Sequence, residues 1–170
     1  IMIKHHRASA RYMVVGLYDD VDSFGIGEET VAHLLATGAK QIDSIPYNKR
    51  LYPLGLVRPD VIIKNGVVQG IARNGIDIFQ CRRSGVNGLL LIDGQAPPNS
   101  EYGAELIVEK AKKYNVKKII GVGGVNDDIP HTRPVIYVAV NTPSLRRGIK
   151  PPMRVLPPEL SADFNSVLLA

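Results

Sequence analysis

The sequence has one cysteine, no tryptophan and no long apolar run. Cys81 alone cannot form an intramolecular disulfide or a metal site that needs several cysteines. No stretch approaches the ~20 apolar residues that cross a bilayer, and the start, IMIKHHRASARY, lacks the ~7–15 apolar residues of a signal peptide. We therefore expect a cytoplasmic protein that does not bind membranes, with a core of mainly Val, Ile, Leu and Ala.

A cluster of basic residues is also lacking, although the net charge is +5 and the sequence pI is about 9.4. Residues 1–85 hold 11 basic and 8 acidic side chains, and residues 86–170 hold 10 and 8. Nucleic-acid binding needs Lys and Arg concentrated on one face, because the phosphates lie along one track. The even distribution favours solvated surface, and we expect no nucleic-acid partner.

The common catalytic motifs are missing as well. The sequence has no Gly-x-Ser-x-Gly elbow and no Gly-x-x-x-x-Gly-Lys-Ser/Thr phosphate loop. Residues 121–126, GVGGVN, resemble a dinucleotide-binding turn, but Asn126 replaces its last glycine, and Pro130 and Pro134 prevent the long helix that must follow. We expect no bound cofactor, and the glycines are better explained by a tight exit from a strand.

Two acidic loops and one cysteine are weaker candidates for chemistry. The residues Asp19, Asp20 and Asp22, and the run Asp127-Asp128-Ile-Pro-His131-Thr-Arg133, do not match a known metal-ligand spacing, so we expect solvated turns and no metal. Arg133 lies at a strand entrance, where it could pair with a carboxylate or phosphate. Cys81 is followed by two arginines but has no histidine near it in the sequence.

The apolar patterns that are present predict alternating strands and helices. Residues 12–17 read as a buried strand, EETVAHLLATG as an amphipathic helix and residues 41–46 as a second strand, which together form a βαβ unit with parallel pairing. Residues 58–80 contain three β runs separated by Asn65-Gly66 and Asn74-Gly75. Asn-Gly between apolar runs is a strong hairpin signal, so we expect an antiparallel meander.

The second half repeats the alternation. LLLID at residues 89–93 reads as a strand, Ser100 as the N-cap of a helix that reaches Tyr114, and residues 118–122 and 135–140 as further strands. Thr142-Pro143 opens a short helix. The prediction is one α/β domain over residues 1–170, with three α/β/α layers and a mixed, mainly parallel sheet that carries the meander; whether the natural termini extend further is left open.

Several motifs together resemble the PAC2 family of proteasome assembly chaperones and their archaeal and bacterial relatives. They are Gly38-Ala39-Lys40, the Asn-Gly turn of the meander, LLLIDGQAPP from residue 89, and GVGG…HTRPVIYVAVNTPSL from residue 121. The resemblance implies a phosphorylase/hydrolase-like fold and a non-enzymatic, oligomeric protein that chaperones proteasome α-subunits. The chain departs from the family pattern in its acidic stretch at residues 19–22 and in its form of the loop after residue 93.

Two functions therefore remain open, and we favour the first. The chain is an oligomeric, chaperone-like protein that binds proteasome α-subunits or related chains. Alternatively, it binds or converts a small molecule such as a nucleotide, nucleoside or phosphate, where loops meet at the carboxyl ends of the strands. The candidate ligand-binding residues are Asp93, Gly94, Gln95, Gly123, Gly124, His131 and Arg133, with Asp93 as the acid or base.

Overall fold

A computed structural model describes residues 10–19, 25–53, 60–72, 75–81, 88–125, 135–157 and 164–170 of the chain. None of the helices in these ranges is long and apolar enough to span a membrane. The elements, in chain order, are β1 (Tyr12–Tyr18), α1 (Ile26–Leu35), β2 (Lys40–Ile45), β3 (Asp60–Lys64), β4 (Val67–Ala72), β5 (Ile76–Cys81), β6 (Leu89–Gln95), α2 (Ser100–Lys113), β7 (Lys118–Gly121), β8 (Ile136–Val138), α3 (Pro143–Arg146), β9 (Met153–Val155) and α4 (Phe164–Leu169).

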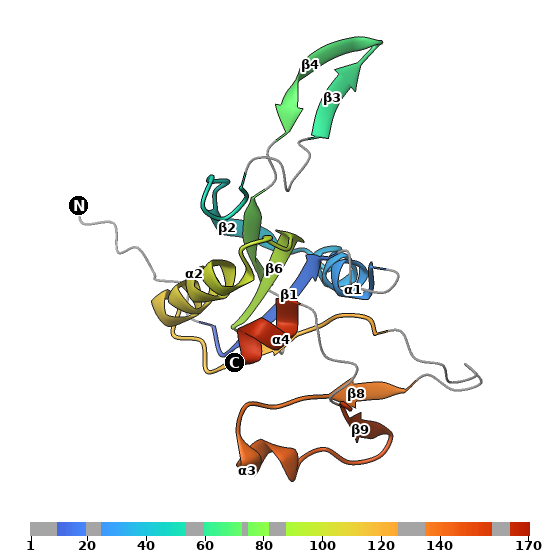
Figure 1. Cartoon of the computed structure of the whole chain (residues 1–170), viewed down its shortest axis with the longest axis vertical. Helices are drawn as coiled ribbons and strands as arrows, with labels where there is room; N and C mark the ends of the chain where they lie inside the picture. Colours follow the sequence, from blue (N-terminus) through green and yellow to red (C-terminus); the bar gives the residue numbers. More distant parts are fainter. Residues whose placement is uncertain are drawn as a thin grey trace.

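The main sheet has five strands in the order β2-β5-β6-β1-β7. Strand β1 pairs in parallel with β6 and β7, whereas β5 pairs antiparallel with both β2 and β6. Helix α1 covers one face of this sheet, and α2 and α4 lie on the other (Figure 1). The predicted α/β class and mixed sheet are confirmed.

The centre of the core is strand β6. Leu90, Leu91 and Ile92 are fully buried although their side chains alternate between the two faces. Leu90 and Ile92 belong to the larger cluster, beneath α2 and α4, and Leu91 packs with Val31 of α1. A strand buried on both faces reads as a continuous apolar run, which explains the sequence LLLI.

Helix α1 lies unusually close to β1 because Gly16 has no side chain. A Cβ atom at Gly16 would lie 2.7 Å from Cγ2 of Val31 and still closer to the carbonyl oxygen of Gly27. Real Cβ atoms do not approach other atoms so closely. Gly16 therefore fixes the separation of helix and sheet.

The expected βαβ pairing and β-meander were wrong in detail. Strand β2 runs parallel to β1 but is separated from it by β6 and β5, since β2 pairs with β5. The three β runs of residues 58–80 also separate: β3 and β4 form their own two-stranded sheet, and β5 enters the main sheet. Local sequence sets hairpin turns, but the choice of partner for β5 depends on burial in the complete sheet.

The Asn65-Gly66 turn forms as expected between β3 and β4. Both residues have positive φ, 52° and 76°, as a tight hairpin turn requires. We call the β3–β4 hairpin, residues 60–72, the arm, because it extends away from the main sheet (Figure 1).

The C-terminal part forms a small lobe and a final helix. Thr142 and Pro143 begin α3 as predicted. Strand β9 lies in a Pro-rich segment and pairs in parallel with β8. Helix α4 then returns to the main body, where Phe164 is buried beside α2.

We predict that Gly16→Ala lowers the free energy of unfolding by about 1–3 kcal/mol, because the new methyl group forces α1 away from β1. Chemical denaturation at neutral pH measures this loss. Gly70→Ala is the matched control, since nothing lies within 4 Å of a Cβ atom at Gly70. An equal loss in the two variants would contradict the close approach at Gly16.

Candidate functional site

Asp93 lies at the carboxyl end of β6, where the sequence placed the candidate site. The strand register sets it beside Gly16 of β1 and opposite Asp77 of β5. Partial burial raises the pKa of Asp93, a hydrogen bond from the Gly94 backbone lowers it, and the charge of Asp77 raises it further. The structure thus supplies a second carboxylate that the sequence analysis missed, since the β5–β6 pairing could not be read locally.

Within the described ranges, this pair of carboxylates belongs to no larger group of metal-binding side chains. Asp77 accepts a hydrogen bond of 2.8 Å from Nε2 of Gln41. Over the described ranges, no group of three or more His, Cys, Asp and Glu side chains could hold a metal ion. Two carboxylates on neighbouring strands repel each other, so the pair disfavours the folded state when both are ionised.

Gly94 and Gln95 both make contacts that hold the loop after β6 in place. Gly94 has φ of 139°, and a Cβ atom there would lie 2.5 Å from the carbonyl oxygen of Gly75 and 3.1 Å from Cα of Ile76. The backbone carbonyl of Gln95 accepts a hydrogen bond of 2.7 Å from the Tyr52 hydroxyl. The predicted ligand loop is therefore packed against β5 and against residues 46–53.

The same loop fixes the start of α2. Pro97 is fully buried, and Gly103 of the helix lies against its ring, too close for a Cβ atom. Asn99 is the N-cap in place of the predicted Ser100, and its side chain accepts a hydrogen bond from the backbone N–H of Tyr102 at 3.4 Å. The contacts of the Pro-Pro loop thus fix the position at which α2 begins.

The remaining candidates do not join Asp93 in one described site. Gly123 and Gly124 follow β7, and Gly123 is exposed. His131 and Arg133 lie outside the described residues, as do the acidic pair at residues 127 and 128 and the aspartates at residues 20 and 22. Asp19 accepts a hydrogen bond of 3.1 Å from the backbone N–H of Phe164, so it secures the start of α4.

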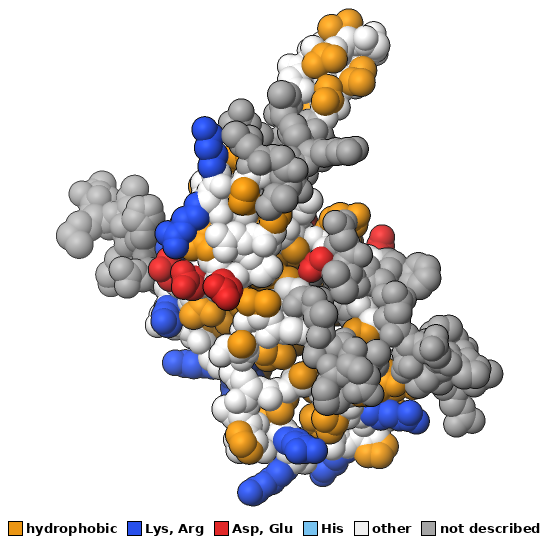
Figure 2. Space-filling model, in the orientation of Figure 1, with side chains coloured by type: hydrophobic (Ala, Val, Ile, Leu, Met, Phe, Trp, Pro, Cys, Tyr) orange, Lys and Arg blue, Asp and Glu red, His pale blue; other side chains and the backbone are white. Residues whose placement is uncertain are grey.

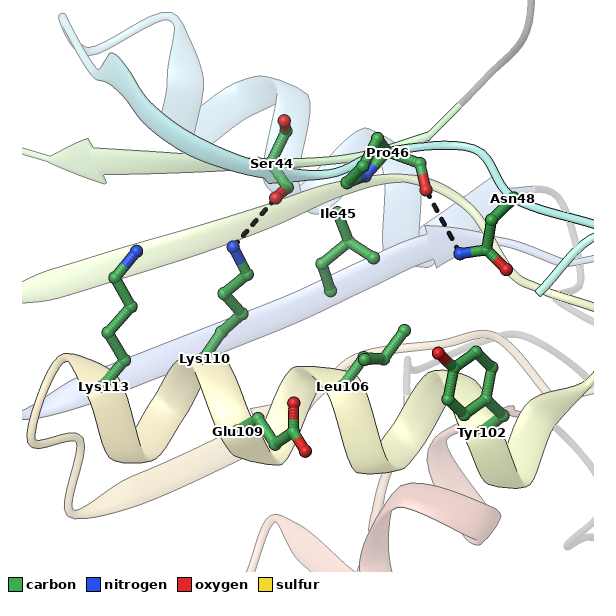
Figure 3. Close-up of a pocket in the computed structure, with 9 residues that line it drawn as sticks. All are labelled: Ser44, Ile45, Pro46, Asn48, Tyr102, Leu106, Glu109, Lys110 and Lys113. Atoms are coloured by element: carbon green, nitrogen blue, oxygen red, sulfur yellow. Dashed lines mark hydrogen bonds between the residues drawn. The ribbon is translucent and has the colours of Figure 1, made fainter. Parts of the chain in front are cut away.

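A separate cleft of about 360 Å³ lies between the exit of β2 and helix α2 (Figure 3). The floor includes the buried side chain of Ile45. Residues Ser44–Asn48 form one wall, and α2 forms the other with residues facing them across the gap (Figure 3). The lining residues are Ser44, Ile45, Pro46, Asn48, Tyr102, Leu106, Glu109, Lys110 and Lys113.

The lysines of this cleft are held by Asp43. Its Oδ2 atom accepts hydrogen bonds from Lys113 at 2.7 Å and from the Tyr114 hydroxyl at 2.8 Å, and pairs with Lys110 at 2.8 Å. Burial tends to raise the pKa of Asp43, but these contacts and the Ser44 backbone N–H outweigh it, so the pKa lies well below its usual range. The cluster ties an edge strand to α2.

The Asp43 cluster was missed by the sequence analysis. Lys110, Lys113 and Tyr114 share one helix face by their spacing, which is a local signal, but nothing local shows that β2 presents an acid to them. Lys110 also donates to the Ser44 carbonyl at 2.9 Å. Among the described residues that line the cleft there is no histidine or cysteine, so these residues include no Ser–His or Cys–His pair for nucleophilic chemistry.

Comparisons with known proteins identify what the chain resembles. The PAC2 family pattern matches residues 25–168. A proteasome-assembly chaperone homologue from Mycobacterium tuberculosis is 25% identical, with a TM-score of 0.71 over 80% of this chain and 59% of that one. A PAC2 family protein from Streptomyces avermitilis is 19% identical, with a TM-score of 0.71 over 93% of this chain and 68% of that one.

An archaeal relative shares the fold. PbaB of Pyrococcus furiosus, described as an archaeal proteasome activator, is 16% identical, with a TM-score of 0.72 over 95% of this chain and 68% of that one. No curated protein matches the sequence. The chain spans between 51% and 59% of the length of the first three solved structures that it matches, so it covers only part of those proteins.

We predict that Asp43→Asn lowers the free energy of unfolding at pH 7 by about 1–2 kcal/mol, because charge-assisted hydrogen bonds from two lysines are weakened. The lowered pKa means that Asp43 stabilises the fold above its unfolded pKa of about 3.9, and that this contribution fades as the pH falls further. Urea denaturation at pH 7 and at pH 3 measures the difference. Glu109→Gln, an exposed change in the same cleft, is the control and should have little effect; a loss that is equal at both pH values would contradict the account.

Asp93→Asn should act in the opposite direction and raise the melting temperature at pH 7. A raised pKa means that the folded state holds the proton of Asp93 more tightly than the unfolded state, so ionisation costs stability as the pH rises through the usual aspartate range. The gain should disappear in acid, where both states are protonated. Thermal unfolding across this range tests the sign, and a melting temperature lowered at pH 7 would show that the Asp93 carboxylate has a stabilising partner.

Proposed function

The chain belongs to the PAC2 family, and we propose that it is a non-enzymatic, proteasome-assembly-chaperone-like protein of the cytoplasm. It works as a homo-oligomer and binds protein partners such as proteasome α-subunits. The observation that carries this proposal is the family match, which spans residues 25–168 and so includes all the sheet strands except β1.

The strand-end residues support a role without catalysis. Gly94 and Gln95 are used in packing, and Asp19 secures α4. Asp93 has a raised pKa and lies opposite Asp77, whose negative charge contributes to that rise. Because these strand-end residues already make contacts within the fold, few of their polar groups are left to bind a substrate.

Exposed apolar side chains support a role in protein binding. The C-terminal lobe of β8, α3 and β9 exposes Ile136, Leu145 and Val155, and the arm exposes five more apolar residues. Contiguous exposed apolar surface typically marks a site of protein contact. Two such regions on one small chain suit a protein that binds other chains.

We predict that the proteasome α-subunits of the same organism co-purify with the tagged chain when the two are co-expressed. Asp93→Asn is a matched variant, and it should retain the subunits equally because Asp93 is not one of the exposed apolar residues proposed to bind them. The bound fraction is measured by quantitative gel analysis after gel filtration.

The opposite result would favour the alternative function. If the α-subunits fail to bind, and a nucleotide, nucleoside or phosphate raises the melting temperature of the wild-type chain but not of Asp93→Asn, the protein binds a small molecule at the strand end. That outcome would reject the chaperone-like role.

A further inference from the structure

The arm is an isolated two-stranded sheet with an apolar surface. In the described part of the chain, β3 and β4 pair with each other and with no other strand. Figure 2 shows hydrophobic side chains along the part of the arm that projects from the body. A two-stranded hairpin alone is at best marginally stable in water, so an arm of this kind needs something to cover it.

Both faces of the arm expose β-branched side chains. Because directly paired residues share a face, Val61, Ile63 and Val68 lie on one side, and Ile62 and Val67 lie on the other with Lys64. Each of the five apolar residues is between 50% and 63% exposed. Soluble monomers rarely expose so continuous an apolar surface.

The two outer edges of the arm differ. The pairing passes from Ile62 opposite Gly70 to Ile63 opposite Val68, so Gln69 is an extra residue in β4. A bulge of this kind bends an edge strand and protects it from pairing with another chain. Strand β3 has no such interruption and no proline, which leaves its outer edge regular and available for a further strand.

We propose that β3 of one copy pairs antiparallel with β3 of a second copy, centred on Ile62. The two arms then form a four-stranded sheet in the order β4-β3-β3-β4. Val61 of each copy lies opposite Ile63 of the other, so the face that carries Val61, Ile63 and Val68 becomes continuous across both arms.

The features of β3 favour a second copy over an unrelated protein. An antiparallel pair of identical strands is related by a two-fold axis, so every backbone group on one edge meets its complement on the other. The sequence of β3, DVIIK, has an acid at one end and a base at the other. Pairing centred on Ile62 sets residue 60 opposite residue 64 at both ends, which is an acid opposite a base.

The size of the contact predicts its strength. Stable interfaces bury about 800 Å² on each partner, and five half-exposed side chains supply less than this. The arm contact by itself therefore gives a concentration-dependent dimer, unless other surfaces of the chain add to it. This inference specifies how two copies of the proposed homo-oligomer contact each other, and to that extent it rests on the proposed function.

Cross-linking tests the register directly. Cys81, the one native cysteine, is buried, so a cysteine introduced as Ile62→Cys on the full chain is the reactive thiol. At the two-fold axis, facing Cα atoms lie about 4.5–5.5 Å apart, which suits a disulfide. Mild oxidation should convert most of Ile62→Cys to a covalent dimer, whereas Ile136→Cys on β8, at a position slightly more exposed than Ile62, should stay monomeric on a denaturing gel. Absence of the Ile62→Cys dimer, or equal dimer from both variants, overturns the proposal.

Two oppositely charged double variants distinguish a loss of arm pairing from a loss of folding. Val61→Lys with Ile63→Lys sets lysines opposite lysines, and Val61→Glu with Ile63→Glu sets glutamates opposite glutamates. Each variant alone should weaken the dimer by about a hundredfold in sedimentation analysis, because like charges face each other. An equimolar mixture should dimerise again, with opposite charges paired. Failure of the mixture to dimerise when both variants keep the wild-type far-ultraviolet spectrum also overturns the proposal.

The outcome for the arm is distinct from the outcome for the proposed function. A covalent Ile62→Cys dimer that fails to retain α-subunits would reject the chaperone-like role and leave the arm pairing intact. Retention of α-subunits by a chain whose arm does not pair would support that role and reject the arm pairing.

Discussion

The burial of the centre of strand β6 on both faces is the constraint on which the rest of the structure depends. Its central residues, Leu90, Leu91 and Ile92, are covered from both sides, so the sheet must carry helices on both faces. Burying each such side chain contributes about 1.5–3 kcal/mol, compared with about 0.5–1.5 kcal/mol for an ordinary hydrogen bond. Strands β1 and β5 pair with β6 on either side. Helix α1 covers one face of β6, and α2 and α4 cover the other.

The same constraint determines what the strand end can do. A strand buried on both faces must leave the core within a short loop, and here that loop is fixed by the contact of Gly94 with Gly75, by the Tyr52 hydroxyl and by the buried ring of Pro97. In many open α/β sheets this position binds the ligand. In this chain the loop is packed, and most of the exposed large apolar residues in the described ranges lie on the arm and on the C-terminal lobe, whereas Tyr18, Ile26 and Ile120 are exposed on the main body.

Local patterns were sufficient to predict much of the fold. The runs around β1 and β6, the amphipathic helix α2, the Asn65-Gly66 turn and the Pro143 helix start each carry their signal within a few residues. Pairing partners could not be predicted in this way, because β5 has no local feature that selects β2 and β6. Both missed clusters, Asp77 with Asp93 and Asp43 with its lysines, depend on such long-range pairing. The exposure of the arm could not be predicted from the sequence either, because its apolar runs resemble those of core strands.

The central claim is that this chain acts through its surfaces and not through a strand-end pocket. Hydrogen exchange, followed residue by residue on the concentrated full chain, tests it most directly. The account predicts that amides of β3 become slower to exchange as the chain concentration rises, while the amides of residues 93–95 do not respond to added nucleotides, nucleosides or phosphate. Protection of residues 93–95 by one of these molecules, with β3 exchanging at the same fast rate at every concentration, would contradict it.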